Sequence, residues 1–236
     1  MLLFYAPNIA VHPQLPEPEA QHCFKVLRMQ AGDIVHLTDG KGNFYRAAIA
    51  GVHPKHCELN ILEIIPRQPE WKGQIAIAVA PTKNMERMEW FAEKATEIGI
   101  DRIAFLNCRF SERKEIKPER INKILVSAMK QSLKACLPEL QAMTDFKNFI
   151  TQPFEGQKFI AHCYSGEKSL LSKIYRPNEN VLVLIGPEGD FSEEEIESAI
   201  NQGFVPVSLG DSRLRTETAA LTACQIIHIV NQMTGK

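Results

Sequence analysis

The 236-residue sequence lacks several features that would assign a protein to a common class at once. It contains no apolar run of about 18 residues, the length that a membrane-spanning helix needs. The N-terminal segment MLLFYAPNIA is too short, and too poor in flanking basic residues, for a signal peptide. Its six cysteines are scattered singly, with no C-x-x-C pair typical of a zinc knuckle or a redox dithiol. We therefore expect a cytoplasmic protein with no membrane contact, whose cysteines are reduced and mostly buried.

Metal binding is also not expected, although three cysteines directly follow a histidine, at Cys23, Cys57 and Cys163. Neighbouring residues on a strand point to opposite faces, so such a pair is poorly placed to share one ion. We interpret these positions as ordinary packing sites.

Motifs for phosphate ligands and for hydrolytic enzymes are missing as well. The sequence has no G-x-x-x-x-G-K-[ST] loop, no G-x-G-x-x-G fingerprint and no G-x-S-x-G elbow. These absences argue against a phosphotransfer enzyme, a dinucleotide-binding enzyme and an α/β hydrolase.

The formal net charge is only −1, but the charge is uneven along the chain. From residue 102 to 134, nine basic residues stand with three acidic ones. Such a run is typical of a surface that binds phosphates. It is equally typical of a solvated helix face, and charge alone leaves both interpretations open. The nine are Arg102, Arg109, Arg113, Lys114, Lys117, Arg120, Lys123, Lys130 and Lys134.

The N-terminal part of the chain reads as β structure. Turn signals divide residues 1–65 into short segments with β-type patterns at 33–40, 43–52 and 56–65. This predicts a small, strongly bent sheet or barrel. Two prolines between apolar runs mark 66–71 as a linker. We therefore place the first domain at 1–70 and the second at 71–236.

From residue 74 onward, strands alternate with helices. An amphipathic helix is predicted at 84–99, ending at Gly99, and another at 118–134, with Pro118 near its first turn. Strands are predicted at 74–80, 102–107, 158–163, 181–186 and 204–210. This alternation predicts an α/β domain, with a parallel sheet covered on both faces.

Two glycine-containing turns follow predicted strands: LIGPEGDFS at 184–192 and SLGDSRLRTETA at 208–219. Ligands of such sheets bind beyond the carboxyl ends of the strands, and glycines let the backbone approach a ligand closely. Glu188 and Asp190 lie inside the first turn, where they would repel a polyphosphate. A cationic or zwitterionic ligand fits better. Glu188 is equally open to a turn-stabilising role.

Charged residues beyond the turns divide into structural and functional candidates. Ser192 and Glu195 have the spacing of a capping box, and acidic residues suit a first helical turn, so we expect them to stabilise a helix. Arg213 and Arg215 precede a helix that is apolar nearly all round, although a helix N-terminus disfavours cations. At least one of them is expected to serve a substrate or a partner carboxylate such as Glu217.

The pair formed by LIGPEGDFS and LGDSRLRTETAALTA resembles the signature of the RsmE-type 16S ribosomal RNA uridine-N3 methyltransferases, of the SPOUT superfamily. The likeness continues through HCFKVLRMQAGD at 22–33, KNMERMEWFAEKATEIGI at 83–100 and SAMKQSLKACLPEL at 127–140. There are two departures. Asp190 stands where the family usually has a second glycine, and Arg213 stands where isoleucine or valine is common.

This resemblance implies a small PUA-like β-barrel followed by a SPOUT domain with a C-terminal deep trefoil knot. It implies that S-adenosyl-L-methionine binds in the knot, between loops at 162–165, 185–190 and 209–216. It also implies a homodimer formed through the knotted domains, and 16S rRNA in the 30S subunit as the partner. The uridine that is modified is not identified by the sequence.

The same resemblance, together with the local charge and the chemistry of the reaction, gives the candidate site residues. Cofactor contacts are expected from His162, Leu184, Ile185, Gly186, Pro187, Glu188, Gly189, Ser208, Leu209, Gly210, Leu214 and Thr216. RNA contacts are expected from Arg28, Lys83, Arg87, Arg109, Arg113 and Lys117. In the reaction, Arg215 would stabilise negative charge on uridine O2 or O4, and Glu217 or Glu188 would accept the N3 proton. The sequence does not choose between the two carboxylates.

Two other functions stay open at this point. One is a non-catalytic RNA-binding protein, which the departure at Asp190 favours. The other is a different SPOUT methyltransferase, acting on transfer RNA or on a ribose 2′-OH.

Overall fold

The computed structural model describes residues 2–53 and 55–234, and the chain forms two compact units. Unit 1 contains Met1–Glu70 and Val126–Leu137, and unit 2 contains Trp71–Leu125 and Pro138–Lys236. The sequence had placed 126–137 in the second domain. It belongs to unit 1 because its backbone bonds there: Ala135 O accepts from Thr38 Oγ1 at 3.1 Å and from Gly42 N at 3.0 Å.

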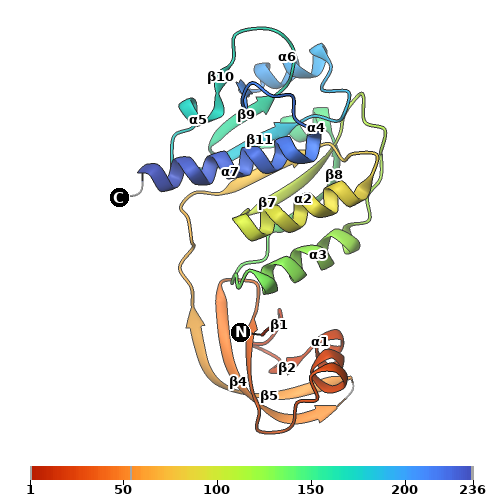
Figure 1. Cartoon of the computed structure of the whole chain (residues 1–236), viewed down its shortest axis with the longest axis vertical. Coiled ribbons are helices and arrows are strands. Elements are labelled where there is room, and N and C mark those ends of the chain that lie inside the picture. The colour runs from red at the N-terminus through yellow and green to blue at the C-terminus, as the bar shows by residue number, and fades with distance from the viewer. Residues whose placement is uncertain (1, 54, 235–236) are drawn as a thin grey trace. The chain divides into compact units, whose positions relative to one another are not determined.

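Unit 1 is built on a five-stranded sheet with the order β1-β3-β4-β5-β2. The three strands predicted within 33–65 are confirmed as β3 (Ile34–Thr38), β4 (Asn43–His53) and β5 (His56–Pro66). The sequence reading missed the short elements β1 (Leu3–Tyr5), β2 (Gln14–Leu15), α1 (Glu17–Gln21) and the π-helix η1 (His22–Val26). Register shifts between β4 and β5 increase the local bend of this long hairpin, whose curvature is visible in Figure 1.

Unit 2 confirms the predicted parallel α/β architecture. Its seven-stranded sheet has the order β10-β12-β9-β11-β6-β7-β8, and neighbouring strands are parallel. The strands are β6 (Ile75–Val79), β7 (Arg102–Asn107), β8 (Glu139–Asp145), β9 (Gln157–Ala161), β10 (Ser169–Leu170), β11 (Val181–Ile185) and β12 (Val205–Ser208). Its helices are α2 (Met85–Ile98), α4 (Phe146–Ile150), α5 (Leu171–Ile174), α6 (Glu193–Asn201) and α7 (Thr216–Thr234). Helix α3 (Pro118–Gln131) begins in unit 2, and its residues from Val126 onward belong to unit 1.

Both faces of this sheet are buried because alternate strand residues pack against different helices. Ala76 and Ala78 of β6 share a core cluster with Phe146 of α4 and Ile196 of α6. The intervening β6 residues are buried too, and α7 contacts β6, β11 and α2. Figure 1 shows α7 and α2 side by side across the sheet. Strands buried on both faces are typical of parallel sheets.

Local signals at helix ends are confirmed. The Asn84 side chain accepts a hydrogen bond from Glu86 N at the start of α2, and Gly99 follows its last turn with a φ of 127°. Ser192 and Glu195 form the predicted capping box at the start of α6. Glu195 also accepts a hydrogen bond from Arg109 N at 2.8 Å. This carboxylate therefore stabilises the fold.

Two further findings concern the whole described chain. None of its helices combines the length and apolarity needed to cross a membrane. All six cysteines are free, and four of them are buried, as predicted.

Candidate functional site

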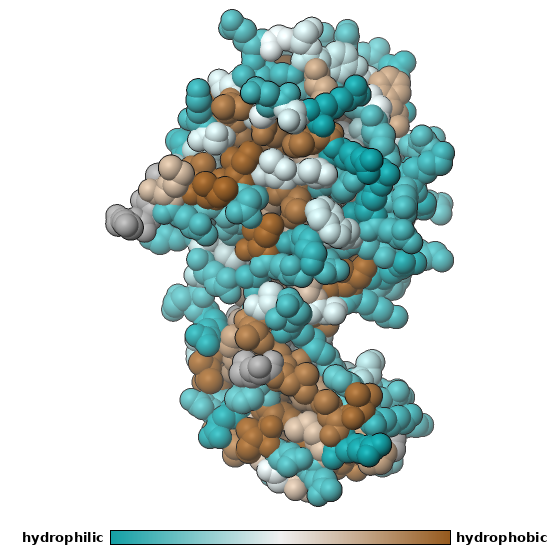
Figure 2. Space-filling model, viewed as in Figure 1, coloured by the Kyte–Doolittle hydropathy of each residue, from teal (hydrophilic) through white to brown (hydrophobic). Residues whose placement is uncertain are grey.

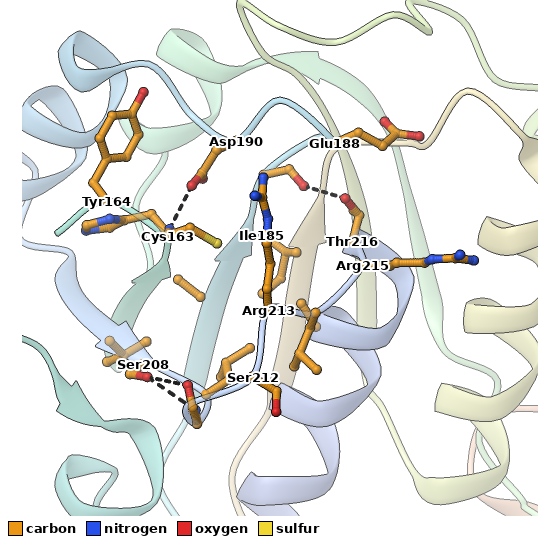
Figure 3. Close-up of a pocket in the computed structure, with 18 of the residues that line it drawn as sticks. Cys163, Tyr164, Ile185, Glu188, Asp190, Ser208, Ser212, Arg213, Arg215 and Thr216 are labelled. Atoms are coloured by element: carbon orange, nitrogen blue, oxygen red, sulfur yellow. Dashed lines mark hydrogen bonds between the residues drawn. The ribbon is translucent and has the colours of Figure 1, made fainter.

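A cavity of about 990 Å³ lies at the carboxyl ends of β9, β11 and β12. These strands are neighbours in the sheet, so the loops that follow them meet at one edge. Figure 3 shows their side chains gathered around the cavity. The lining comprises Arg87, 161–164, Lys168, 185–190, 207–216 and Ala219.

The loop after β11 is held in a tight turn. Asp190 N donates to Pro187 O at 2.9 Å, and Thr216 Oγ1, at the start of α7, donates to Gly186 O at 3.1 Å. A Cβ on Gly186 would lie 3.1 Å from Phe191 N, which is tighter than nine in ten real Cβ contacts. A side chain at this position would therefore push against the backbone of the turn.

Asp190 joins two of the three loops. Its Oδ2 accepts a hydrogen bond from Cys163 N at 2.7 Å, and its Oδ1 accepts one from Phe191 N at 2.8 Å. Its φ is +66°, in the left-handed region that glycine adopts freely and that aspartate tolerates better than most residues. Asp190 thus has a left-handed backbone conformation that a glycine would also adopt. Its carboxylate links the β11 loop to the β9 loop through Cys163 N.

Glu188 holds the outer side of the same loop. Its Oε1 accepts a hydrogen bond from Lys83 N at 2.9 Å, and in Figure 3 its carboxylate points away from the other labelled side chains. This arrangement favours the turn-stabilising role over that of a proton acceptor.

The loop after β9 is closed by a lysine. Lys168 Nζ donates to His162 O and to Tyr164 O, each at 2.6 Å. Burial, and then the nearby Lys168 charge, lower the pKa of His162 below its ordinary value. Since a lowered pKa leaves histidine deprotonated at neutral pH, His162 contributes a neutral ring to the cavity wall.

The two arginines of the third loop point in different directions. In Figure 3, Arg213 reaches across the middle of the cavity toward the loop with Cys163 and Asp190, whereas Arg215 points the other way. Both side chains are exposed. Among the described residues, no ion pair involves Arg215.

Glu217 does not take the place that the sequence suggested for it. It is only 7% exposed, does not line the cavity, and lies 3.9 Å from Arg87 Nε, so its nearest cation is Arg87. Its other oxygen is buried without a hydrogen-bond partner in the described part of the chain. A carboxylate outside the cavity is poorly placed to take a proton from a bound nucleotide. This position favours pairing with Arg87 over the role of proton acceptor for Glu217.

Most of the expected cofactor residues line the cavity. Leu184 is the exception, because it is fully buried in the core cluster that also contains Ile160 and Phe191. Those found at the cavity are His162, Ile185, Gly186, Pro187, Glu188, Gly189, Ser208, Leu209, Gly210, Leu214 and Thr216. The cavity lining also includes Cys163, Tyr164, Asp211 and Ser212, which lie in the loops expected at 162–165 and 209–216. Lys168 lies outside those loops and was missed.

The basic run at 102–134 is not one continuous free surface, because it is divided between the two units and many of its charges are paired. Arg102 lies over the Phe154 ring, and four others contact carboxylates: Arg109 with Glu194, Arg120 with Glu89, Lys130 with Glu19 and Lys134 with Glu70.

The expected RNA-binding residues have different surroundings. Arg87 lines the cavity, Lys83 pairs with Glu112 at 2.9 Å, and Arg113 donates to Lys83 O. Arg28 and Lys117 are exposed.

Comparisons with known proteins agree with this fold and with its two-part organisation. A family model described as an RNA methyltransferase domain matches residues 69–228, and one described as an RNA methyltransferase PUA domain matches 15–62. A curated relative from Synechocystis, "Ribosomal RNA small subunit methyltransferase E", is 30% identical over 208 residues, which cover 84% of this chain and 67% of the relative.

Solved structures of rRNA methyltransferases are also similar to this chain. A probable rRNA methyltransferase from Porphyromonas gingivalis is 47% identical with a TM-score of 0.93, and the match covers 99% of both chains. A ribosomal RNA small subunit methyltransferase E from Neisseria gonorrhoeae, bound to S-adenosyl methionine, is 28% identical with a TM-score of 0.83 and 98% coverage of both chains. The chain thus belongs to the RNA methyltransferase family that includes ribosomal RNA small subunit methyltransferase E, as its paired glycine turns predicted.

Proposed function

We propose that this protein transfers a methyl group from S-adenosyl-L-methionine to N3 of one uridine in 16S rRNA of the small ribosomal subunit. The observation that supports this proposal most directly is the cavity formed by the three loops beyond β9, β11 and β12. A relative of the same fold, from Neisseria gonorrhoeae, binds S-adenosyl methionine.

The charges around the cavity fit this cofactor better than a phosphate ligand. Four cationic side chains and three carboxylates line it: Arg87, Lys168, Arg213 and Arg215, with Glu188, Asp190 and Asp211. S-adenosylmethionine carries a sulfonium, an ammonium and a carboxylate, so a lining of mixed sign suits it. Glycines at 186, 189 and 210 expose backbone groups for further contacts.

When bound, S-adenosylmethionine supplies an activated methyl group, and the protein's part is orientation and electrostatics. Uridine N3 must lose its proton before or during attack on the methyl group, which leaves negative charge on O2 and O4. We assign stabilisation of this charge to Arg215, an exposed cation at the cavity with no carboxylate paired to it in the described structure. The Glu188 carboxylate accepts a hydrogen bond from Lys83 N, and Glu217 lies outside the cavity. We therefore assign solvent water as the acceptor of the uridine N3 proton.

Titration calorimetry tests the cofactor assignment. We expect one S-adenosylmethionine to bind per chain, and ATP, a phosphate-bearing adenosine compound, not to bind. Binding of ATP with comparable affinity, or no binding of S-adenosylmethionine, would contradict the assignment.

Assembly into a homodimer is part of the proposal. Trp90 on α2 is 43% exposed, and Ile229 and Met233 on α7 are 43% and 79% exposed. Figure 2 shows hydrophobic side chains gathered over α7. Apolar residues on two packed helices indicate a surface that a second copy covers. We place this contact in the domain where the family resemblance expects a trefoil knot.

Light scattering tests the dimer. We expect twice the chain mass at micromolar concentration, and dissociation in Ile229→Arg, because an arginine would be buried unpaired at the contact. Ile200 on α6 is similarly exposed, at 45%, and Ile200→Arg is the matched control that should stay dimeric. An active wild-type monomer would contradict the proposal.

RNA binding is assigned to the exposed cations, among them Arg28 and Lys117. We expect Lys117→Ala to weaken binding to small subunits and to reduce the slope of log affinity against log salt by about one, since one phosphate contact is lost. Cofactor affinity should stay unchanged. Lys173 on α5 is also exposed and lies outside the basic run, so Lys173→Ala is the control. If the slope of log affinity against log salt is the same for both variants, Lys117 does not contact RNA phosphates.

A further inference from the structure

Phe110 is a large apolar side chain held at the surface by a rigid loop. It is 45% exposed, although its neighbours Cys108 and Ser111 are buried. Cys108 N donates to Ser111 Oγ and Ser111 N donates to Cys108 O, both at 3.0 Å. On the other side, Arg109 N is bonded to the buried carboxylate of Glu195. The backbone around Phe110 is therefore fixed, and its exposure does not result from a loose loop.

The ring lies against the rim of the cofactor cavity. A Cβ on Gly189, which lines the cavity, would lie 3.1 Å from Phe110 Cβ. The two loops are thus in van der Waals contact, one carrying a cavity residue and the other an exposed aromatic ring. Any nucleotide that enters the cavity beside Gly189 comes within reach of Phe110.

One cation, Arg109, lies against this ring, and it also pairs with Glu194. The Arg109 guanidinium carbon lies 5.8 Å from the ring centroid. Between residues 109 and 117, four basic side chains stand with two acidic ones, a surplus of two. A second hollow next to this segment is lined by three cations and two carboxylates: Lys83, Arg113 and Lys114, with Glu112 and Glu115. An exposed aromatic ring among cations matches single-stranded RNA, which presents base faces for stacking and phosphates for charge pairing.

We propose that Phe110 is a stacking platform for an unpaired RNA base adjacent to the nucleotide that is methylated. This inference rests on the proposed function and adds to it a residue that positions the RNA. Stacking accounts for the exposure of a fixed aromatic ring at the cavity rim. Nearby cations such as Arg109 would bind the phosphates that flank the stacked base.

The test compares Phe110→Ala, Phe110→Leu, Phe110→Tyr and the control Ile200→Ala, whose side chain has the same 45% exposure. Binding to small subunits that lack the methyl group is measured over a range of salt, together with S-adenosylmethionine affinity and mass by light scattering. Loss of base stacking should weaken RNA binding of Phe110→Ala by about 10- to 100-fold. The salt slope should not change, because no charge is removed. Phe110→Tyr should bind as the wild type does.

Three results would overturn the inference. Normal RNA binding by Phe110→Ala would exclude stacking. A loss of dimer mass or of cofactor affinity in that variant would show that the ring serves protein packing. Rescue by Phe110→Leu would show that only apolar bulk is needed. The proposed function fails separately, if the wild-type protein neither binds nor methylates small subunits.

Discussion

Replacing Arg215 with alanine is expected to lower kcat for methylation of small subunits by about 10²-fold, the usual effect of removing one preorganised charge-stabilising contact. Arg215 lines the cavity, is exposed, and has no carboxylate paired to it among the described residues. Its side chain points away from Arg213 and the Asp190 loop. An interaction with the uridine anion is stronger in the transition state than in the ground state, so the effect should be on kcat. The Kd for S-adenosylmethionine should change by no more than a few-fold.

Single-turnover kinetics and calorimetry separate these quantities. Arg215→Lys is the conservative variant, and it should retain part of the rate because it keeps the charge while losing the planar fork. A parallel loss of cofactor binding and rate in Arg215→Ala would place Arg215 in the cofactor pocket and end its catalytic assignment.

The second large effect is expected for Gly210→Val, which should reduce affinity for S-adenosylmethionine by more than about 10²-fold, because atoms forced into a filled site are strongly destabilising. Gly210 lines the cavity, and a Cβ there would meet no protein atom within 4 Å. The added side chain would therefore occupy space assigned to the cofactor.

Backbone strain needs its own control, because Gly210 has a φ of +135° that valine adopts poorly. Gly166 has a φ of +137°, also has open space around its Cβ position, and does not line the cavity. Gly166→Val should show a similar fall in Tm, on the order of 5 °C, with normal cofactor binding. If both variants lose cofactor equally, strain rather than occupied space explains the result.

Local sequence patterns predicted much of this fold. The capping box of Ser192 and Glu195, the helix end at Gly99 and the buried strand at 181–185 each depend on residues close in sequence. Short elements such as β10 and α5 escaped prediction, because two to four residues carry too little periodicity. β8 was missed because it is a half-exposed edge strand without clear alternation.

The site was predicted less completely, because its side chains find partners far away in the sequence. Glu217 was predicted as a possible partner of Arg213 or Arg215, close to it in sequence, whereas the fold brings it to Arg87 on α2. The basic run suggested a single patch, but Arg109 and Arg120 each contact a carboxylate from a distant helix. Lys168 gave no sequence signal at all, since its role depends on two backbone carbonyls of a folded loop.

The most direct test of the central claim is nucleoside analysis by mass spectrometry after reaction with labelled S-adenosylmethionine. Small subunits and transfer RNA, both from cells that lack the enzyme, are the two substrates. We predict that the label appears only in 16S rRNA, at N3 of one uridine. Label on a ribose, label in transfer RNA, or no label in either substrate would contradict the account.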